Sequence, residues 1–328
     1  MQTHDLKTGE LIDDHEEKAL RMKLDSPGTL KKIYKQQQKA TSDSTGSSED
    51  ASLRERSRFN FLPGTESIKT IKEFCFTPAP FEFKNKTIKA RITREKSKIV
   101  SKTTQYYLHL ENGNERSFIM SARKVTNSKS SYYIISTDTE SILRSSGQKF
   151  TVGKLRSNVL GTKFIAYDNG FPPNSPKGMK DSKNIHEELV MICYDPNILG
   201  LHGPRKMTVI IPAMNESKQR IPQKPLSTDQ AIDNKFLTGK TNNLVKLINV
   251  KPVWSEDSNS FVLNFHGRVT MASVKNFQIV HENDPHYLVM QFGRISHDVF
   301  TIDWRYPFCA FQAFAVALSS FDNKLACE

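Results

Sequence analysis

The segment PFCAFQAFAVALSSF, residues 307–321, constrains the fold of this chain more than any other feature. It is too long and too rich in alanine for a strand, and Pro307 suits the first turn of a helix. Apolar side chains fall on every side of that helix, so it must be buried all round. It is also shorter than a helix that spans a bilayer. We therefore expect the rest of the protein to surround it, with Phe311, Phe314 and Leu318 in the core.

Short alternating stretches before this helix predict a long series of strands. In residues 86–94, Ile88, Ala90 and Ile92 alternate with polar side chains, which is the period of a half-buried strand. Asn112-Gly113 predicts a hairpin between two further stretches. The other candidate strands are residues 106–110, 118–120, 132–136, 164–167, 189–194, 207–211, 261–266, 277–281, 287–292 and 299–304. The pattern predicts a mainly β fold: a closed antiparallel β-barrel around a central buried hydrophobic C-terminal helix, since closure also removes exposed strand edges.

The first part of the chain has a different composition. It includes the polar run TSDSTGSSED at residues 41–50 and offers too little apolar surface to offset the entropy of ordering. Only residues 11–24 show helical spacing of apolar side chains. We therefore divide the chain into residues 1–72, mostly disordered with at most a short helix, and residues 73–328, one folded domain. Within that domain, residues 171–183 and 216–243 are polar and are expected to be surface loops.

The net charge of +12 falls on the later part, because residues 1–60 contain equal numbers of basic and acidic side chains. Such an excess of basic side chains favours anionic partners, either nucleic acid or acidic lipid headgroups, and does not distinguish between the two. The four cysteines are far apart, and no leader or long apolar run is present, so we expect an intracellular protein that is not secreted. We expect no cofactor and no enzyme, because no GxSxG, P-loop or HExxH motif occurs. His281, Asp284 and His286 favour a polar turn over a metal site.

Several long stretches resemble the tubby and tubby-like protein family. They are FHGRVTMASVKNFQ (265–278), NFQIVHENDPHYLVMQFGRISHDVF (276–300) and AFAVALSSFDNKLACE (313–328), with GKLRSNVLGTKFIAYDNG (153–170) and NILGLHGPRKMTVIIPAMN (197–215) upstream. The resemblance covers roughly residues 74–328. It implies a closed β-barrel with a hydrophobic helix threaded through it, in agreement with the fold expected above.

The resemblance also implies a phosphoinositide-binding site. The family's Lys-x-Arg pair, which binds phosphatidylinositol 4,5-bisphosphate, stands here as Lys154 and Arg156. Two further contact positions differ: Tyr132 stands where the family has Asn, and His186 where it has Arg. Tyr132 can still donate a hydrogen bond, whereas a histidine is largely neutral at pH 7. The preference among phosphoinositides is therefore left open.

The residues themselves are consistent with this role. On a strand, Lys154 and Arg156 project from the same face, about 6.6–6.8 Å apart along the backbone, while Leu155 points the other way. A guanidinium grips one phosphate bidentately and an ammonium acts as a point charge. Without the family, a solvated strand face would be the more ordinary interpretation. Arg123 and Lys124 either widen this basic surface or only aid solubility.

The resemblance implies a membrane adaptor that ferries receptors into cilia. In that scheme the barrel holds the lipid, and an N-terminal segment binds complex A of intraflagellar transport. Residues 13–40 are loosely similar to that segment, and a merely charged tail is the alternative. The expected location is the cytoplasm, peripheral at the plasma membrane or cilium, with the nucleus as a second site. A nucleic-acid-binding transcriptional regulator released from the membrane is the alternative function.

Overall fold

In this computed structural model the described residues are 53–96, 103–125, 130–139, 150–195, 206–256 and 259–322. The helix expected at residues 11–24 and the transport-complex segment at residues 13–40 lie outside the described residues.

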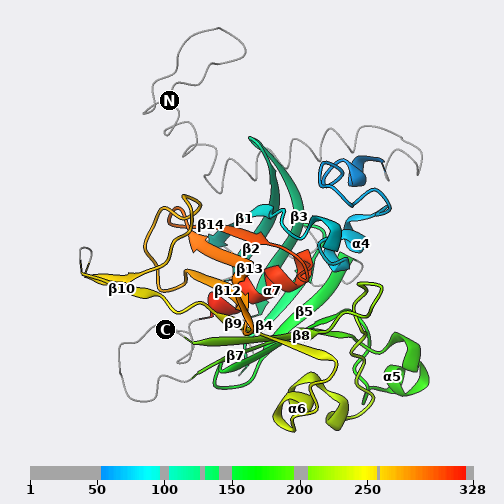
Figure 1. The fold of residues 1–328 in the computed structure, drawn as a ribbon. Coiled ribbons are helices and arrows are strands. Elements are labelled where there is room, and N and C mark those ends of the chain that lie inside the picture. The colour runs from blue at the N-terminus through cyan, green and yellow to red at the C-terminus, as the bar shows by residue number, and fades with distance from the viewer. Residues whose placement is uncertain are drawn as a thin grey trace. The chain divides into compact units, whose positions relative to one another are not determined.

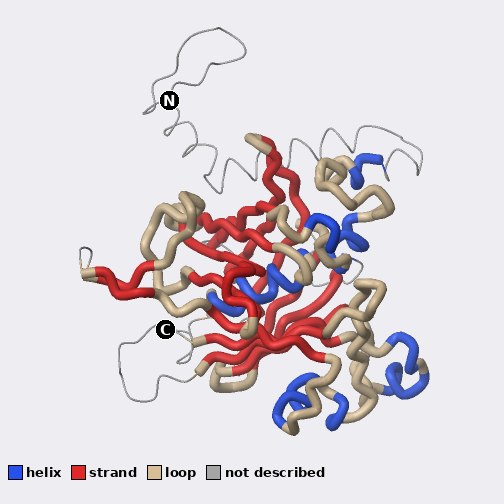
Figure 2. Tube along the Cα trace, viewed as in Figure 1, coloured by secondary structure: helices blue, strands red, loops and turns tan. Residues whose placement is uncertain are grey.

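Twelve antiparallel strands close into a barrel, and α7 (Ala310–Ser320) lies among them (Figures 1 and 2). The strands are β1 (Ile88–Lys96), β2 (Thr104–Asn112), β3 (Glu115–Val125), β4 (Tyr132–Ser136), β5 (Thr151–Ser157), β6 (Lys163–Asp168), β7 (Glu188–Tyr194), β8 (Met207–Pro212), β9 (Leu244–Asn249), β12 (Phe277–His281), β13 (Asp284–Arg294) and β14 (Val299–Trp304). Pairing of β14 with β1 completes the ring, so the barrel has no open edge strand. The predicted fold class is confirmed.

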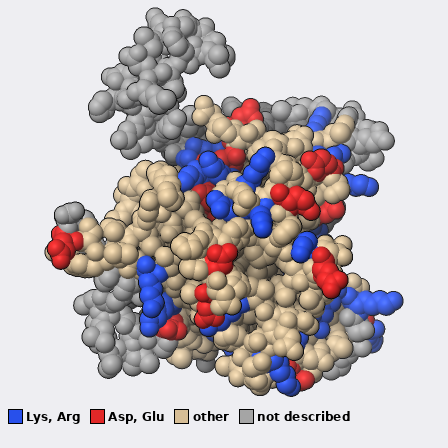
Figure 3. Space-filling model, viewed as in Figure 1, with Lys and Arg blue, Asp and Glu red and all other residues tan. Residues whose placement is uncertain are grey.

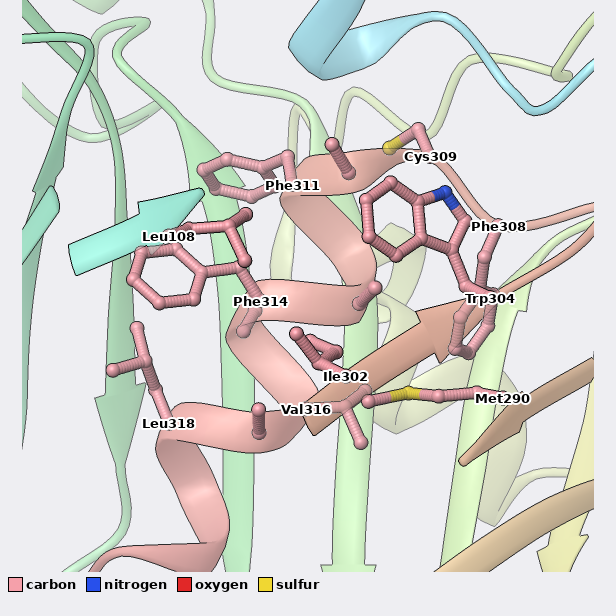
Figure 4. Close-up of a cluster of buried hydrophobic side chains, with 14 of the residues drawn as sticks. Leu108, Met290, Ile302, Trp304, Phe308, Cys309, Phe311, Phe314, Val316 and Leu318 are labelled. Atoms are coloured by element: carbon pink, nitrogen blue, oxygen red, sulfur yellow. The ribbon is translucent and has the colours of Figure 1, made fainter. Parts of the chain in front are cut away.

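The helix α7 is the centre of the core, and every one of its residues is buried. Phe311, Phe314 and Leu318 are 0% exposed, as expected. Figure 4 shows Phe314 close to Leu108 of β2, while Val316 lies on the side of α7 that faces β14. The helix begins at Ala310, later than Pro307, because Cys309 is its N-cap in extended backbone.

The polar groups of this buried helix find partners in the barrel. The Gln312 amide donates to the Leu189 carbonyl of β7 at 2.8 Å. The Ser319 hydroxyl lies 2.8 Å from the hydroxyl of Tyr194. At the end of α7, Lys275 Nζ donates to the Ser320 carbonyl at 3.0 Å, which places a cation at the negative end of the helix dipole. Buried polar groups need such partners, so these bonds help to fix the position of α7 in the barrel.

The smaller elements lie outside the barrel. They are α4 (Ile71–Phe76), η1 (Phe81–Phe83), α5 (Pro176–Lys180), η3 (Ser182–Asn184), η4 (Thr228–Gln230), α6 (Ile232–Leu237), β10 (Val253–Ser255) and β11 (Ser260–Val262). The expected strand at residues 261–266 is wrong: only Ser260–Val262 is a strand, and it pairs with β10 in a separate two-stranded sheet. The two stretches expected to be loops contain the short helices α5 and α6.

The described segment upstream of residue 73 packs on the barrel's core. Phe59 is 0% exposed and stacks on Phe74 with ring centroids 4.9 Å apart. Ile68 belongs to the same buried cluster as α7. The expected division at residues 72 and 73 therefore falls inside a segment whose side chains reach the core.

Candidate anion-binding site

Lys154 and Arg156 project from the outer face of β5. Between them Leu155 is 0% exposed and belongs to the core, so the strand alternates as the sequence predicted. Arg156 is exposed and Lys154 is half-buried. The strand thus presents two cations side by side to the outside of the barrel.

The register of β4, β5 and β6 sets the neighbours of the two cations. Tyr132 of β4 pairs with Arg156, and Ile134 pairs with Lys154. On the other side, Tyr167 of β6 pairs with Lys154. Side chains directly opposite one another in a sheet have Cβ atoms about 4.5–5.5 Å apart, so each cation has a tyrosine next to it.

His186 joins this group from the segment before β7. Its ring stacks on Tyr167, with ring centroids 4.7 Å apart. A backbone bond from His186 N to Phe171 O at 3.0 Å holds its segment to the preceding loop. A Cβ at Gly170 would come within 2.5 Å of the His186 backbone, so this close approach requires a glycine. We call Tyr132, Lys154, Arg156, Tyr167 and His186 the outer cluster.

The two rings of the stacked pair are both electrically neutral near pH 7. Burial lowers the pKa of His186 below its ordinary value; nearby Asp168 raises it and Lys154 lowers it further. Burial raises the pKa of Tyr167 to about 12, so its hydroxyl stays protonated. Within the described chain, His186 Nδ1 is buried without a hydrogen-bond partner. The cluster therefore combines two fixed cations with neutral groups that can form hydrogen bonds.

Neither cation of the outer cluster is neutralised by the described residues: Lys154 and Arg156 form no salt bridge and no side-chain hydrogen bond with them. Other basic side chains of the barrel differ. Lys163, at the start of β6, pairs with Asp233 of α6. Arg268 pairs with Glu111 at 2.8 Å and also with Asp303. Two like charges held side by side without salt-bridge partners favour an anionic ligand.

Arg123 and Lys124 have different roles. Arg123 of β3 pairs with Ile134 of β4, and Ile134 in turn pairs with Lys154 of β5. Arg123 therefore extends the row of side chains on the outer face of the barrel. Lys124 instead lies 3.3 Å from the fully buried Asp322. Only Arg123 can widen the basic surface.

Tyr167 is the member of the outer cluster that the sequence did not single out. Its strand was expected, and alternation with the buried Ala166 places it outside. Its position beside Lys154 and His186 depends on strand register, which alternation does not reveal.

Charge alone would not have located this site. Figure 3 shows basic and acidic side chains in mixed groups on the face that it draws. His281 Nδ1 accepts a hydrogen bond from Asn283 N at 3.1 Å, as in the expected polar turn. Among the described residues, no group of three His, Cys, Asp or Glu side chains is placed to hold a metal ion. In the same residues, no helix has the length and apolar character to cross a bilayer.

Comparison with known proteins agrees with the resemblance. The Tub family model matches residues 77–323. Tubby-related protein 3 of Mus musculus is 48% identical over 263 residues, which cover 80% of this chain and 56% of that protein. Tubby-related protein 1 of Mus musculus is 46% identical over 258 residues, 78% of this chain and 46% of that protein. Protein king tubby 1 of Aedes aegypti is 45% identical over 287 residues, 87% of this chain and 67% of that protein. The chain thus spans about half to two thirds of these relatives' lengths, and it belongs to the Tub family, the family of tubby-like proteins.

Proposed function

We propose that the outer cluster binds the headgroup of phosphatidylinositol 4,5-bisphosphate and that the protein is a membrane adaptor. The observation that carries the proposal is the pair Lys154 and Arg156, adjacent on one strand face and without a salt-bridge partner among the described residues. A bisphosphorylated ring has separate anionic groups for the two side chains. Arg156 suits bidentate binding of one phosphate, and Lys154 supplies a point charge for another.

The neighbours of the two cations fit a sugar ring with hydroxyl groups. Tyr167 keeps its hydroxyl proton at neutral pH and can donate a hydrogen bond. Tyr132, opposite Arg156, offers a second hydroxyl. His186, stacked on Tyr167, brings a ring nitrogen that lacks a partner in the described chain. His186 carries no fixed charge there, so the pair on β5 supplies most of the electrostatic attraction.

The wider role follows from the family resemblance. We propose that the lipid holds the protein peripherally at the plasma membrane or cilium, where it takes part in the trafficking of receptor cargo into cilia. Residues 13–40 are the proposed contact for complex A of intraflagellar transport. The nucleus is the second proposed location.

Nucleic-acid binding is the competing function, and the described elements favour it less. Outside the barrel, the helices α4, α5 and α6 have 6, 5 and 6 residues, and a further helical stretch is described only over residues 53–56. Recognition helices that enter the major groove are longer and rich in basic side chains.

The test is flotation with phosphatidylcholine vesicles that contain phosphatidylinositol 4,5-bisphosphate, run beside a DNA mobility shift at matched salt. Lys154→Ala with Arg156→Ala should weaken vesicle binding by at least about a hundredfold, since hydrogen bonds to charged groups contribute about 1.5–3 kcal/mol each. The control is Lys89→Ala with Lys96→Ala, which removes the same charge from exposed positions on β1, four strands away around the barrel. Equal loss in both double variants would mean that net charge, rather than this site, binds the vesicle.

A further inference from the structure

Two aliphatic side chains occupy the tip of the turn between β5 and β6. Val159 and Leu160 are each 65% exposed, although they are the central residues of the turn 158–161. Turns of this kind ordinarily carry Gly, Pro, Asn, Asp or Ser at such positions. Neither side chain belongs to a hydrophobic cluster of the described residues.

The turn is rigidly built. Asn158 Oδ1 accepts from Thr162 N at 2.9 Å and from Lys163 N at 3.1 Å, while Asn158 Nδ2 donates to Thr162 Oγ1 at 2.7 Å. Asn158 N donates to Lys163 O at 2.9 Å, and Gly161 takes a φ of +72° to close the loop. The apolar tip is therefore presented in a fixed shape, and little conformational entropy is lost when it is buried.

The same bonds have a second consequence. A segment that enters an apolar medium must have its backbone polar groups paired within the protein, since each unpaired group costs several kcal/mol in hydrocarbon. At this turn, Asn158 provides acceptors for Thr162 N and Lys163 N. The base of the turn thus keeps its hydrogen bonds when water is removed.

The turn continues directly from the strand that carries the outer cluster. Val159 follows Arg156 by three residues, which is about 10 Å along an extended chain. No acidic residue occurs between Thr151 and Lys163, so the stretch of the hairpin that joins the two cations to the turn carries no negative charge. Two unneutralised cations and an apolar tip within this distance match a phosphoinositide membrane, which has anionic headgroups above an apolar layer.

We propose that the turn 158–161 inserts Val159 and Leu160 into the bilayer beside the lipid whose headgroup is held by Lys154 and Arg156. The proposal rests on the proposed function. The partner of the turn is the lipid surface itself. Insertion adds an apolar contribution to the binding of vesicles, and the binding of a soluble headgroup lacks this contribution.

The test compares wild type with Val159→Ser plus Leu160→Ser. Three probes are used: phosphatidylcholine vesicles containing phosphatidylinositol 4,5-bisphosphate, soluble inositol 1,4,5-trisphosphate, and a lipid monolayer whose surface pressure is recorded. The double variant should bind vesicles at least about tenfold more weakly, bind the soluble headgroup as wild type does, and lose the rise in monolayer pressure. Met271→Ser plus Val274→Ser is the matched control. These residues are 41% and 76% exposed, and their loop bonds to Arg294 of β13, six strands from β5 around the barrel.

The outcomes separate the two proposals. If wild type binds neither vesicles nor the soluble headgroup, the proposed function fails. If wild type binds vesicles and the Val159/Leu160 variant binds them equally well, the insertion proposal is wrong, and a protein partner at the turn becomes the better explanation of its exposure. Loss of soluble-headgroup binding in the variant would also overturn insertion, because the turn would then be acting on the headgroup site. An unchanged melting temperature confirms that each variant is folded.

Discussion

The ring of Phe311 on α7 fills the space that a side chain at position 153 would need. A Cβ built on Gly153 would lie 2.5 Å from Phe311 Cε2 and 2.6 Å from the Tyr167 carbonyl oxygen. The buried helix therefore touches the backbone of the strand that carries Lys154, at the residue directly before it. This contact links the core to the outer cluster.

Gly153→Ala should lower the free energy of unfolding by about 1–3 kcal/mol, the usual cost of overpacking. Chemical denaturation measures it. Phe311→Leu replaces the clashing ring with a smaller side chain. In the Phe311→Leu background, Gly153→Ala should therefore lower the free energy of unfolding by less. If the two changes are additive, the contact is not responsible for the loss.

The second prediction concerns where the stable domain starts. Because Phe59 is fully buried and stacks on Phe74, residues 53–328 should unfold cooperatively at about the temperature of the full chain. A chain starting at residue 73 lacks Phe59 and Ile68 and should melt lower by several degrees. Limited proteolysis followed by mass measurement gives the start of the resistant fragment. A resistant core that begins at residue 73 with unchanged stability would show that the Phe59 packing is unimportant.

The third prediction concerns Glu188 at the start of β7. This carboxyl group is 6% exposed, and its Oε2 accepts from Ile232 N at 2.7 Å. Burial raises its pKa from 4.5 to about 7, although that hydrogen bond opposes the rise. The folded state therefore holds the proton more tightly than the unfolded state. The stabilisation is complete below pH 4.5 and is lost as the pH rises through 7.

Glu188→Gln should remove this pH dependence while keeping an acceptor for Ile232 N. Between pH 4.5 and pH 8, wild type should lose about 1–3 kcal/mol of stability relative to the variant. Denaturant titrations of both proteins across this range measure the difference. Parallel stability curves for the two proteins would contradict the raised pKa.

Alternation along the chain predicted most of the barrel strands, but β5 (Thr151–Ser157) was not among the candidate strands. Alternation also failed where a second layer covers the outside of the barrel. The strand β9 was not predicted. Its Leu244 packs against a small outer cluster with Ile232 of α6, so both faces of the strand carry apolar side chains and no clean alternation remains. The helix α6 was missed for the related reason that its apolar residues are few and stand in a polar stretch.

The candidate site, too, could be predicted from the sequence only in part. The outward direction of Lys154 and Arg156 follows from the period of a strand, and the inward direction of Leu155 is confirmed. Which residues lie across from them depends on β4 and β6, and on the loop that carries His186 against Tyr167. These are long-range relationships that local pattern does not determine.

The last prediction uses the titration of His186. In the free protein, burial keeps its pKa below the ordinary value of 6.5, so the ring is neutral at pH 7.4. A bound polyanion favours the charged form, and protonation would place a third cation beside Lys154. Relative to His186→Gln, wild type should therefore bind vesicles containing phosphatidylinositol 4,5-bisphosphate increasingly well as the pH falls from 7.4 to 5.5. Without lipid, acidification has an unfavourable effect. The unfolded state takes up the His186 proton more readily than the folded state, so the free energy of unfolding falls below pH 6.5.

His186→Arg supplies the charge at every pH. It should bind about tenfold more tightly than wild type at pH 7.4 and show little further gain on acidification, because the guanidinium does not titrate in this range. The phosphate groups of the lipid also titrate near pH 6, and comparing the three proteins at each pH cancels that contribution. If wild type and His186→Gln keep the same affinity ratio from pH 7.4 to pH 5.5, the ring of His186 does not face the headgroup, and the cations on β5 act without it.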